Sequence, residues 1–110
     1  MNNFKIKLSN TEWTINMVEP TDPILDGNQG YCIYRNDAIY VANNLTCQQI
    51  KNAIAHELAH ALLAESGFNV KVKEFFKEDY EIFVDNLSKP LRNLLDARIN
   101  LDGFIEPAGA

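Results

Sequence analysis

The sequence predicts an α+β fold, in which a small antiparallel sheet packs on one central helix and one or two further helices follow. Two observations support this prediction. Apolar and polar residues alternate in the first part of the chain, and apolar residues recur at helical spacing in the second part. A length of 110 residues suits one domain and is too short for two. We therefore expect residues 1–110 to form a single domain, with 103–110 as a C-terminal tail.

Strand periodicity fills the first part of the chain. The turn Ser9-Asn10-Thr11 separates two alternating segments, which predicts a hairpin. Residues 19–30 form a loop rich in turn-forming and acidic residues, and a polar turn at 35–37 separates the next two segments. The four expected strands, which together predict a mostly antiparallel sheet, are Phe4–Leu8, Trp13–Met17, Tyr31–Tyr34 and Ala38–Val41.

The central helix has a clear start and a clear end. Thr46 and Gln49 have the spacing of a capping box, in which each side chain accepts a hydrogen bond from the other residue's backbone N–H group. Apolar residues then recur at helical spacing from Ile50 to Leu63. Gly67 stands where a glycine commonly ends a helix. The sequence therefore predicts one long helix between Thr46 and Gly67.

Further helical segments are expected after this helix. Residues 68–72 are interpreted as a connector, and a second helix is predicted from about Lys73 to Leu87. Pro90 is expected to interrupt the helical pattern, because proline lacks the N–H group that a helix interior needs. Ser88 would then cap a third helix that ends near Leu101.

Composition narrows the possible partners and the location. The formal net charge is −5 and Lys and Arg do not cluster, so a nucleic-acid partner is not expected. No apolar run is long enough for a membrane span, and the first residues do not have the pattern of a signal peptide. Cys32 and Cys47 are accordingly expected to be reduced and buried. These features together predict a cytoplasmic protein.

The segment His56-Glu57-Leu58-Ala59-His60 lies in the middle of the predicted central helix and contains the only two histidines of the chain. Residues four apart on a helix differ by about 40° in direction and by ~6 Å along the axis. Both imidazoles can therefore bind one metal ion. Glu57 is turned by about 100° and would reach a metal-bound water as a general base. Zinc is the metal that suits two imidazoles, a carboxylate and a water.

A pair of solvated or merely structural histidines is the alternative interpretation. The residues around His56 and His60 are largely apolar, however, and burying a His-Glu-His group among them costs desolvation free energy. A bound metal ion offsets that cost, so we favour a metal site.

The third ligand is expected to be an acid of the following helix. The chain has no third histidine, which excludes the metalloprotease pattern with a histidine shortly downstream. Glu81 is the favoured ligand, with Glu78 and Asp79 as alternatives; a solvated surface acid is the other interpretation of Glu81. Asp85 lies four residues further on the same helix face. It could accept a hydrogen bond from a ligand histidine and so fix its tautomer.

These residues resemble a known family. The chain is similar to small zincins of the glutamate-ligand branch, especially short phage- and prophage-associated proteins related to the ImmA/IrrE metallopeptidases. The resemblance covers roughly residues 24–87 and is specific at His56–Ala61. It is carried by Leu25-Asp26-Gly27 through Gly30, by Ile39-Tyr40-Val41, by Ile54-Ala55-His56-Glu57-Leu58-Ala59-His60-Ala61-Leu62-Leu63, and by Phe83-Val84-Asp85.

The resemblance implies a minimal zincin-like catalytic core. It implies that His56 and His60 bind Zn²⁺, that Glu57 is the general base, and that the substrate is a peptide or protein, such as a regulatory protein of a mobile element. The expected function is that of a zinc-dependent endopeptidase. The alternative is a zinc-binding interaction module of a phage or prophage without catalytic activity. Many such enzymes stabilise the oxyanion with a further His or Tyr, and here only tyrosines could do so: Tyr31, Tyr34, Tyr40 and Tyr80.

Overall fold

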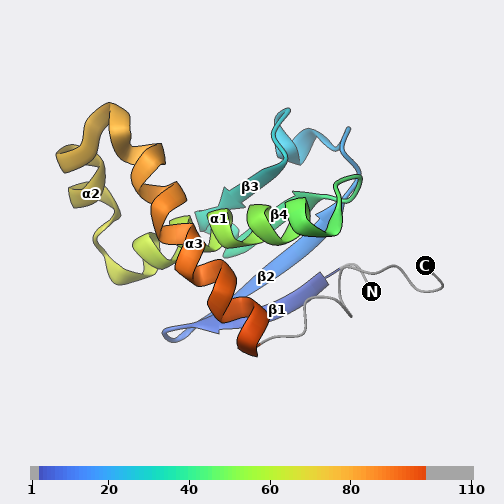
Figure 1. Ribbon diagram of the computed structural model, residues 1–110, viewed down its shortest axis with the longest axis horizontal. Helices are drawn as coiled ribbons and strands as arrows, with labels where there is room; N and C mark the ends of the chain where they lie inside the picture. The colour runs from blue at the N-terminus through green and yellow to red at the C-terminus, as the bar shows by residue number, and fades with distance from the viewer. Residues whose placement is uncertain (1–2, 99–110) are drawn as a thin grey trace.

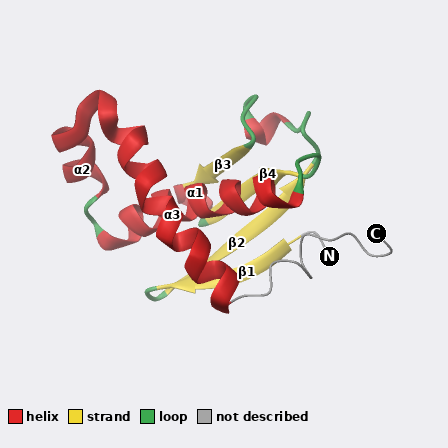
Figure 2. Cartoon of the chain, viewed as in Figure 1, coloured by secondary structure: helices red, strands yellow, loops and turns green. Residues whose placement is uncertain are grey.

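The structure, a computed structural model, describes residues 3–98 (Figure 1). The strands are β1 (Asn3–Leu8), β2 (Thr11–Val18), β3 (Gly30–Ile33) and β4 (Ala38–Ala42). The helices are α1 (Cys47–Ser66), α2 (Asn69–Phe76) and α3 (Tyr80–Arg98), and short 3-10 turns lie at Pro23–Leu25, Tyr34–Asn36 and Lys77–Asp79. The predicted α+β fold is confirmed (Figure 2).

The sheet contains four strands in the order β1-β2-β4-β3. Both predicted strand pairs are antiparallel: β1 pairs with β2, and β3 pairs with β4. The central pairing of β2 with β4 is parallel, so the sheet is mixed. The reason is that the chain passes from β2 to the far edge of the sheet at β3, and β4 then returns between them. As a result β3 is the edge strand next to the central helix (Figure 1).

Helix α1 covers one face of the sheet and forms the core with it. The centre of this core combines Trp13, Ile15 and Ile39 of the sheet with Ile54 and Leu58 of α1, and each of these side chains is at most 2% exposed. Burying a side chain of this size stabilises the fold by about 1.5–3 kcal/mol. Packing against the sheet therefore fixes which face of α1 is turned away from the core.

The two predicted ends of α1 are confirmed. Thr46 Oγ1 accepts a hydrogen bond from the Gln49 backbone N–H at 3.2 Å, and Gln49 Oε1 accepts one from the Thr46 N–H at 2.9 Å. Gly67 ends the helix with φ +80°, in the left-handed region that glycine adopts without steric cost. These caps set the register of the helix that carries the His-Glu-His residues.

The prediction for the segment after α1 was wrong in three respects. Residues 69–72, expected as part of a connector, belong to α2. Phe68, the N-cap residue directly before α2, makes no side-chain capping bond, so the sequence carries no start signal there. The helix predicted from about Lys73 to Leu87 is divided by the 3-10 turn Lys77–Asp79, so α2 ends at Phe76 and α3 begins at Tyr80. Pro90 does not interrupt the helical pattern but lies inside α3, and Ser88 lies in the same helix rather than capping a third one.

Packing on both sides of Pro90 explains why α3 continues. Val84 and Leu87 before the proline and Leu91 after it belong to one apolar cluster with α1. Contacts of this kind offset the cost of an interior proline, about 3 kcal/mol. The predicted helix end at Leu101 and the tail at 103–110 lie outside the described residues.

Two further properties concern location. No helix within residues 3–98 combines the length and the apolar character that a membrane span requires. Cys32 and Cys47 are not joined in a disulfide, and both are half-buried rather than fully buried.

Candidate metal centre

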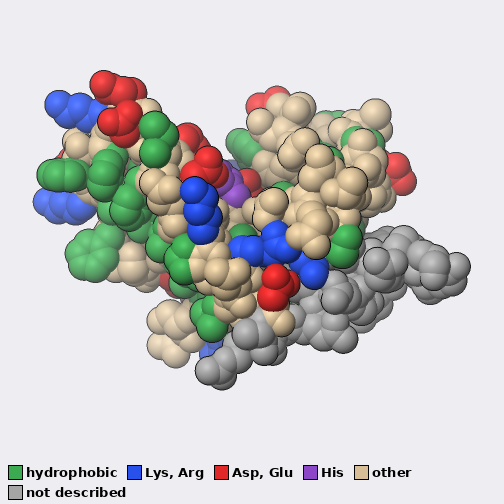
Figure 3. Space-filling model, in the orientation of Figure 1, with side chains coloured by type: hydrophobic (Ala, Val, Ile, Leu, Met, Phe, Trp, Pro, Cys, Tyr) green, Lys and Arg blue, Asp and Glu red, His purple; other side chains and the backbone are tan. Residues whose placement is uncertain are grey.

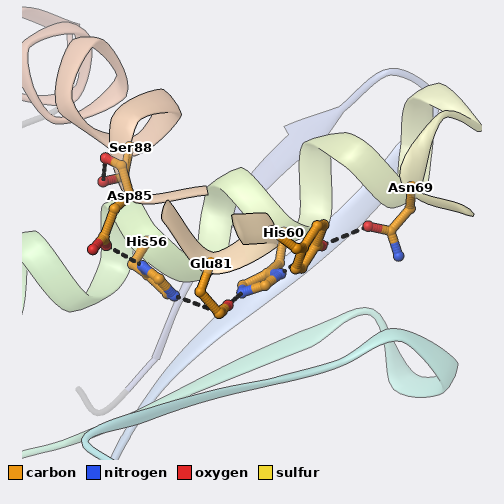
Figure 4. A network of polar contacts seen from close by, with 7 residues as sticks. His56, His60, Asn69, Glu81, Asp85 and Ser88 are labelled. Atoms are coloured by element: carbon orange, nitrogen blue, oxygen red, sulfur yellow. Dashed lines mark hydrogen bonds and ion pairs between the residues drawn. The ribbon is translucent and has the colours of Figure 1, made fainter. Parts of the chain in front are cut away.

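His56 and His60 lie on the side of α1 that faces α3, one helical turn apart. Their ring centroids are 5.0 Å apart, and their side chains are 26% and 14% exposed. The opposite side of α1 is occupied by the sheet, so both rings project into the space between α1, α3 and β3 (Figure 4). The sequence spacing thus produces the shared direction that was predicted for the two imidazoles.

Glu81 in the first turn of α3 completes the cluster. Its Oε1 atom lies 3.1 Å from His60 Nε2, and its Oε2 atom lies 3.8 Å from His56 Nε2 (Figure 4). One ligand atom from each of the three residues lies within 4.8 Å of the others. The alternatives Glu78 and Asp79 lie in the 3-10 turn before α3 and do not join this cluster within residues 3–98.

Neighbouring side chains fix the tautomers of both histidines. Asp85 Oδ1 lies 2.9 Å from His56 Nδ1, and a carboxylate only accepts, so His56 donates from Nδ1. The Tyr80 hydroxyl donates its single proton to Asn69 Oδ1 at 2.6 Å, and so it accepts from His60 Nδ1 at 3.1 Å (Figure 4). When both rings are neutral, these contacts leave the lone pairs on the two Nε2 atoms.

With neutral rings this cluster consists of acceptors alone, and a proton on His60 Nε2 would instead make a hydrogen bond to Glu81 Oε1 at 3.1 Å. Two Nε2 lone pairs and the Glu81 carboxylate are directed at one region, where they repel one another electrostatically. A cation removes this repulsion, and two imidazoles with one carboxylate are the donor set that zinc takes in three-ligand sites. The residues present fit a zinc ion.

The sequence analysis did not identify Tyr80 as the residue that orients His60, or Asn69 as the residue that accepts a hydrogen bond from Tyr80. Tyr80 was only one of four candidates for oxyanion stabilisation, and the structure uses its hydroxyl to orient His60 instead. Its position directly before Glu81 was the available signal. Asn69 carried no signal, because its contact depends on how the first residue of α2 lies against the first residue of α3.

The side chain of Glu57 extends from α1 toward Gly30 of β3, and Glu57 is only 9% exposed. Gly30 of β3 provides the space for it: a Cβ atom at Gly30 would lie 3.2 Å from Glu57 Cγ and 3.3 Å from its Oε2. Burial raises the pKa of Glu57 to about 7, while His56 lowers it and Glu81 raises it further. Burial also lowers the pKa of His60, although Glu81 opposes this effect.

A cavity of about 320 Å³ opens between these residues and the edge strand. Both histidines, Glu57 and Glu81 line one side, and residues of β3 with the following turn line the other, including Tyr31, Cys32 and Tyr34. The general-base candidate and the three acceptors therefore share one solvent-connected space.

No protein-family model, curated protein or solved structure matches this chain. A function for the chain is therefore inferred from its motif and from the arrangement of the residues within 3–98.

The first prediction concerns the stability of the metal-free protein. Because the pKa of Glu57 rises from an ordinary value of 4.5 to about 7 on folding, the folded state holds a proton that the unfolded state releases between these values. The contribution of protonated Glu57 to the free energy of unfolding is fully present below pH 4.5 and is lost as the pH rises through about 7. The loss amounts to ~3 kcal/mol, at 1.36 kcal/mol per pKa unit.

Urea unfolding in the presence of a chelator measures this effect. His60, whose pKa is lowered, acts in the opposite direction, so the comparison must be made against Glu57→Gln at each pH. We expect the wild type to lose about 2–3 kcal/mol relative to the variant between pH 5 and pH 7.5. Equal pH dependence of the two proteins would contradict the burial of an ionisable Glu57.

Proposed function

We propose that this protein is a zinc-dependent peptidase, in which His56, His60 and Glu81 hold the ion and Glu57 is the general base. The observation that carries the proposal is the convergence of both Nε2 atoms on the Glu81 carboxylate, with each Nδ1 atom in contact with a neighbouring side chain. A structural pair of histidines does not require one ligand atom from each of three residues to converge within 4.8 Å of the others.

The position of Glu57 defines its part in the reaction. When bound, zinc lowers the pKa of a water molecule and polarises a substrate carbonyl. Glu57 takes a proton from the attacking water at its carboxylate and delivers it to the leaving amine nitrogen, as a general base and then a general acid. It faces the cavity beside the three ligands but is not one of them.

The edge strand supports a peptide as the substrate. Within residues 3–98, β3 pairs only with β4, so its other edge carries backbone N–H and C=O groups available for a further strand. An extended peptide added there gains main-chain hydrogen bonds. The same strand borders the cavity that contains Glu57, which would bring a peptide bond to the site.

Tyr34 is the best-placed tyrosine for stabilising the oxyanion. Tyr80 is occupied with His60 and Asn69, and Tyr40 does not line the cavity. Tyr31 borders the cavity but is the cross-strand partner of Tyr40, so its side chain starts from the sheet face away from α1. Tyr34 lines the cavity with the site residues and packs edge-on against Trp13 at 6.4 Å. Burial raises its pKa, so its hydroxyl stays protonated and available as a donor.

The second prediction follows from this position. Tyr34→Phe is expected to lower kcat by about 10²-fold, the typical effect of removing one oxyanion donor, and to leave zinc content unchanged. Steady-state cleavage of a fluorogenic peptide measures the loss. Tyr40→Phe removes a hydroxyl outside the cavity and is the matched control. Equal kcat values for wild type and Tyr34→Phe would exclude this role for Tyr34.

The relationship to the ImmA/IrrE-type zincins, a cytoplasmic location and a regulatory protein of a mobile element as substrate belong to the same proposal. They depend on the motif residues and on the fit of the site to zinc. The direct test is cleavage of a fluorescently labelled unfolded protein by the purified chain. We expect hydrolysis that a chelator abolishes and that added zinc restores. Hydrolysis that a chelator leaves unchanged would contradict the proposal.

A non-catalytic zinc-binding interaction module is the second candidate. It is favoured by apolar side chains exposed around α2, where Phe68 is 63%, Val70 65% and Phe75 79% exposed. Side chains of this kind on a small protein often mark a partner surface. This candidate predicts zinc binding without hydrolysis, and it predicts that Glu57→Gln changes no biological activity.

A further inference from the structure

A second cavity, of about 400 Å³, adjoins the candidate metal centre between the start of β3 and the first half of α1. We call it the amide pocket, because four carboxamide side chains line it: Asn28, Gln29, Gln49 and Asn52. Its lining contains no Lys or Arg, and its one acid is Glu57. In Figure 3 the surface to the right of the histidine, toward the first turns of α1, is mostly uncharged. The amide pocket therefore suits a ligand that forms hydrogen bonds without carrying a charge.

Gln49 and Asn52 each have one half of the carboxamide engaged inside the protein. The Gln49 Oε1 atom accepts a hydrogen bond from the Thr46 backbone N–H at 2.9 Å, as part of the capping box. The Asn52 Oδ1 atom accepts a hydrogen bond from the Arg92 guanidinium. The NH₂ groups of both side chains make no hydrogen bond to residues 3–98. Two donor groups are consequently left for a ligand.

Asn28 has the opposite polarity. Its Nδ2 atom donates to the Leu25 C=O at 3.0 Å and, at 3.4 Å, to the Asp26 C=O. Its Oδ1 atom accepts no hydrogen bond from the described part of the chain. Asn28, Gln49 and Asn52 are all exposed, so a ligand can reach them. The same lining thus offers two donor groups and one acceptor.

The amide pocket is continuous with the reaction site. It shares Gly30, His56 and Glu57 with the cavity beside the three proposed zinc ligands. Gln49, Asn52 and His56 are three and four residues apart, so they follow one face of α1. A peptide whose cleaved bond lies beside Glu57 can therefore place a neighbouring side chain over Gln49 and Asn52.

The backbone of Gly30 can hold such a peptide at the junction of the two cavities. The Ala42 N–H donates to the Gln29 C=O at 2.9 Å, one position before the pair of Gly30 with Val41. Successive residues of an antiparallel strand direct their backbone groups alternately to the two sides. The N–H and C=O groups of Gly30 are therefore directed to the edge of β3 that faces away from β4.

We propose that the amide pocket binds the side chain of a glutamine or asparagine residue of the substrate peptide, next to the cleaved bond. Only a carboxamide carries an acceptor oxygen for Gln49 and Asn52 and, on a separate atom, N–H groups for Asn28. A carboxylate has no donor for Asn28, and an ammonium has no acceptor for the two NH₂ groups. This inference rests on the proposed peptidase function, because it assigns the pocket to the substrate of that site.

Peptide binding tests the pocket without turnover. Random short peptides are selected on zinc-loaded Glu57→Gln protein, and every variant compared carries this same change. We expect Gln or Asn to be enriched at one position. Synthetic copies with Gln→Met or Gln→Glu at that position are expected to bind about fivefold more weakly, as for the loss of one exposed hydrogen bond. Selection that yields no peptide, or that enriches no carboxamide residue at any position, would overturn the inference.

Two isosteric variants identify the site of recognition. Gln49→Glu still accepts from the Thr46 N–H, and glutamate suits this position of a capping box, but the free donor group is replaced by an acceptor. We expect it to lose the preference for Gln over Met. Gln48→Glu makes the same charge change one residue away, outside the lining, and keeps an oxygen for Arg92; it is expected to retain the preference. A preference that survives Gln49→Glu, or one that both variants lose, would contradict the assignment.

The two proposals can fail separately. If the selected peptides bind through Gln49 but the wild type does not cleave them, the peptidase proposal fails while the amide pocket stands. If the wild type cleaves peptides at equal rates with Gln or Met at every position, the pocket inference fails while the peptidase stands.

Discussion

Purified without added metal and without a His tag, the protein is expected to contain about one zinc ion per chain, as a three-ligand site requires. His56→Ala and His60→Ala are expected to lower zinc affinity by more than ~10²-fold, because each leaves two ligands of the three that converge. Metal analysis by mass spectrometry and competition with a chelator measure stoichiometry and affinity. This is one of the two largest effects that the structure predicts.

Variants of the acidic residues show which of them binds the zinc ion. Glu81→Gln is expected to weaken zinc binding nearly as strongly as loss of a histidine, since the cluster contains no other acid among the described residues. Asp85→Asn acts only through His56 Nδ1 and is expected to weaken zinc binding by about 10–100-fold. Glu78→Gln removes a charge from the 3-10 turn before Glu81 and is the control, with unchanged affinity expected.

Two outcomes would contradict the metal site. Protein that is purified free of metal and takes up no zinc on titration would show that the histidines are structural. Zinc binding that is lost in Glu78→Gln and retained in Glu81→Gln would show that Glu78, rather than Glu81, is the third ligand.

The features of the fold that were predictable from sequence are those encoded locally. The capping box at Thr46 and the glycine at Gly67 define α1 through contacts between near neighbours, so the pattern alone locates its ends. Alternation predicts strands and hairpins for the same reason. The parallel pairing of β2 with β4 joins segments far apart in the chain, and no local signal encodes it.

The candidate site likewise contains some features that are encoded locally and others that depend on packing between distant segments. The positions of His56, Glu57 and His60 follow from helical geometry, and the spacing of Glu81 and Asp85 follows from the same rule on α3. The contact of Asn69 with Tyr80, and of Gly30 with Glu57, depends on how separate elements pack. Pro90 failed as a helix breaker because packing of α3 along α1 on both sides of it outweighs a local penalty.

Glu57→Gln is expected to lower kcat/KM for peptide cleavage by about 10³–10⁴-fold while zinc content stays near one per chain. The amide keeps the shape of the side chain beside Gly30 but cannot accept the proton of the attacking water. Cleavage of a fluorogenic peptide, with zinc measured on the same sample, shows both results. Glu74→Gln, on exposed α2, removes a charge without touching the cavity and is the control.

The stability of Glu57→Gln makes the interpretation of this experiment direct. Because the buried carboxylate destabilises the metal-free fold near neutral pH, the variant is expected to be at least as stable as the wild type. Loss of activity in a folded, zinc-loaded variant then reports on proton transfer. Full activity in the same variant would exclude Glu57 as the general base and favour a zinc-binding module, since a structural site needs no buried carboxylate beside its ligands.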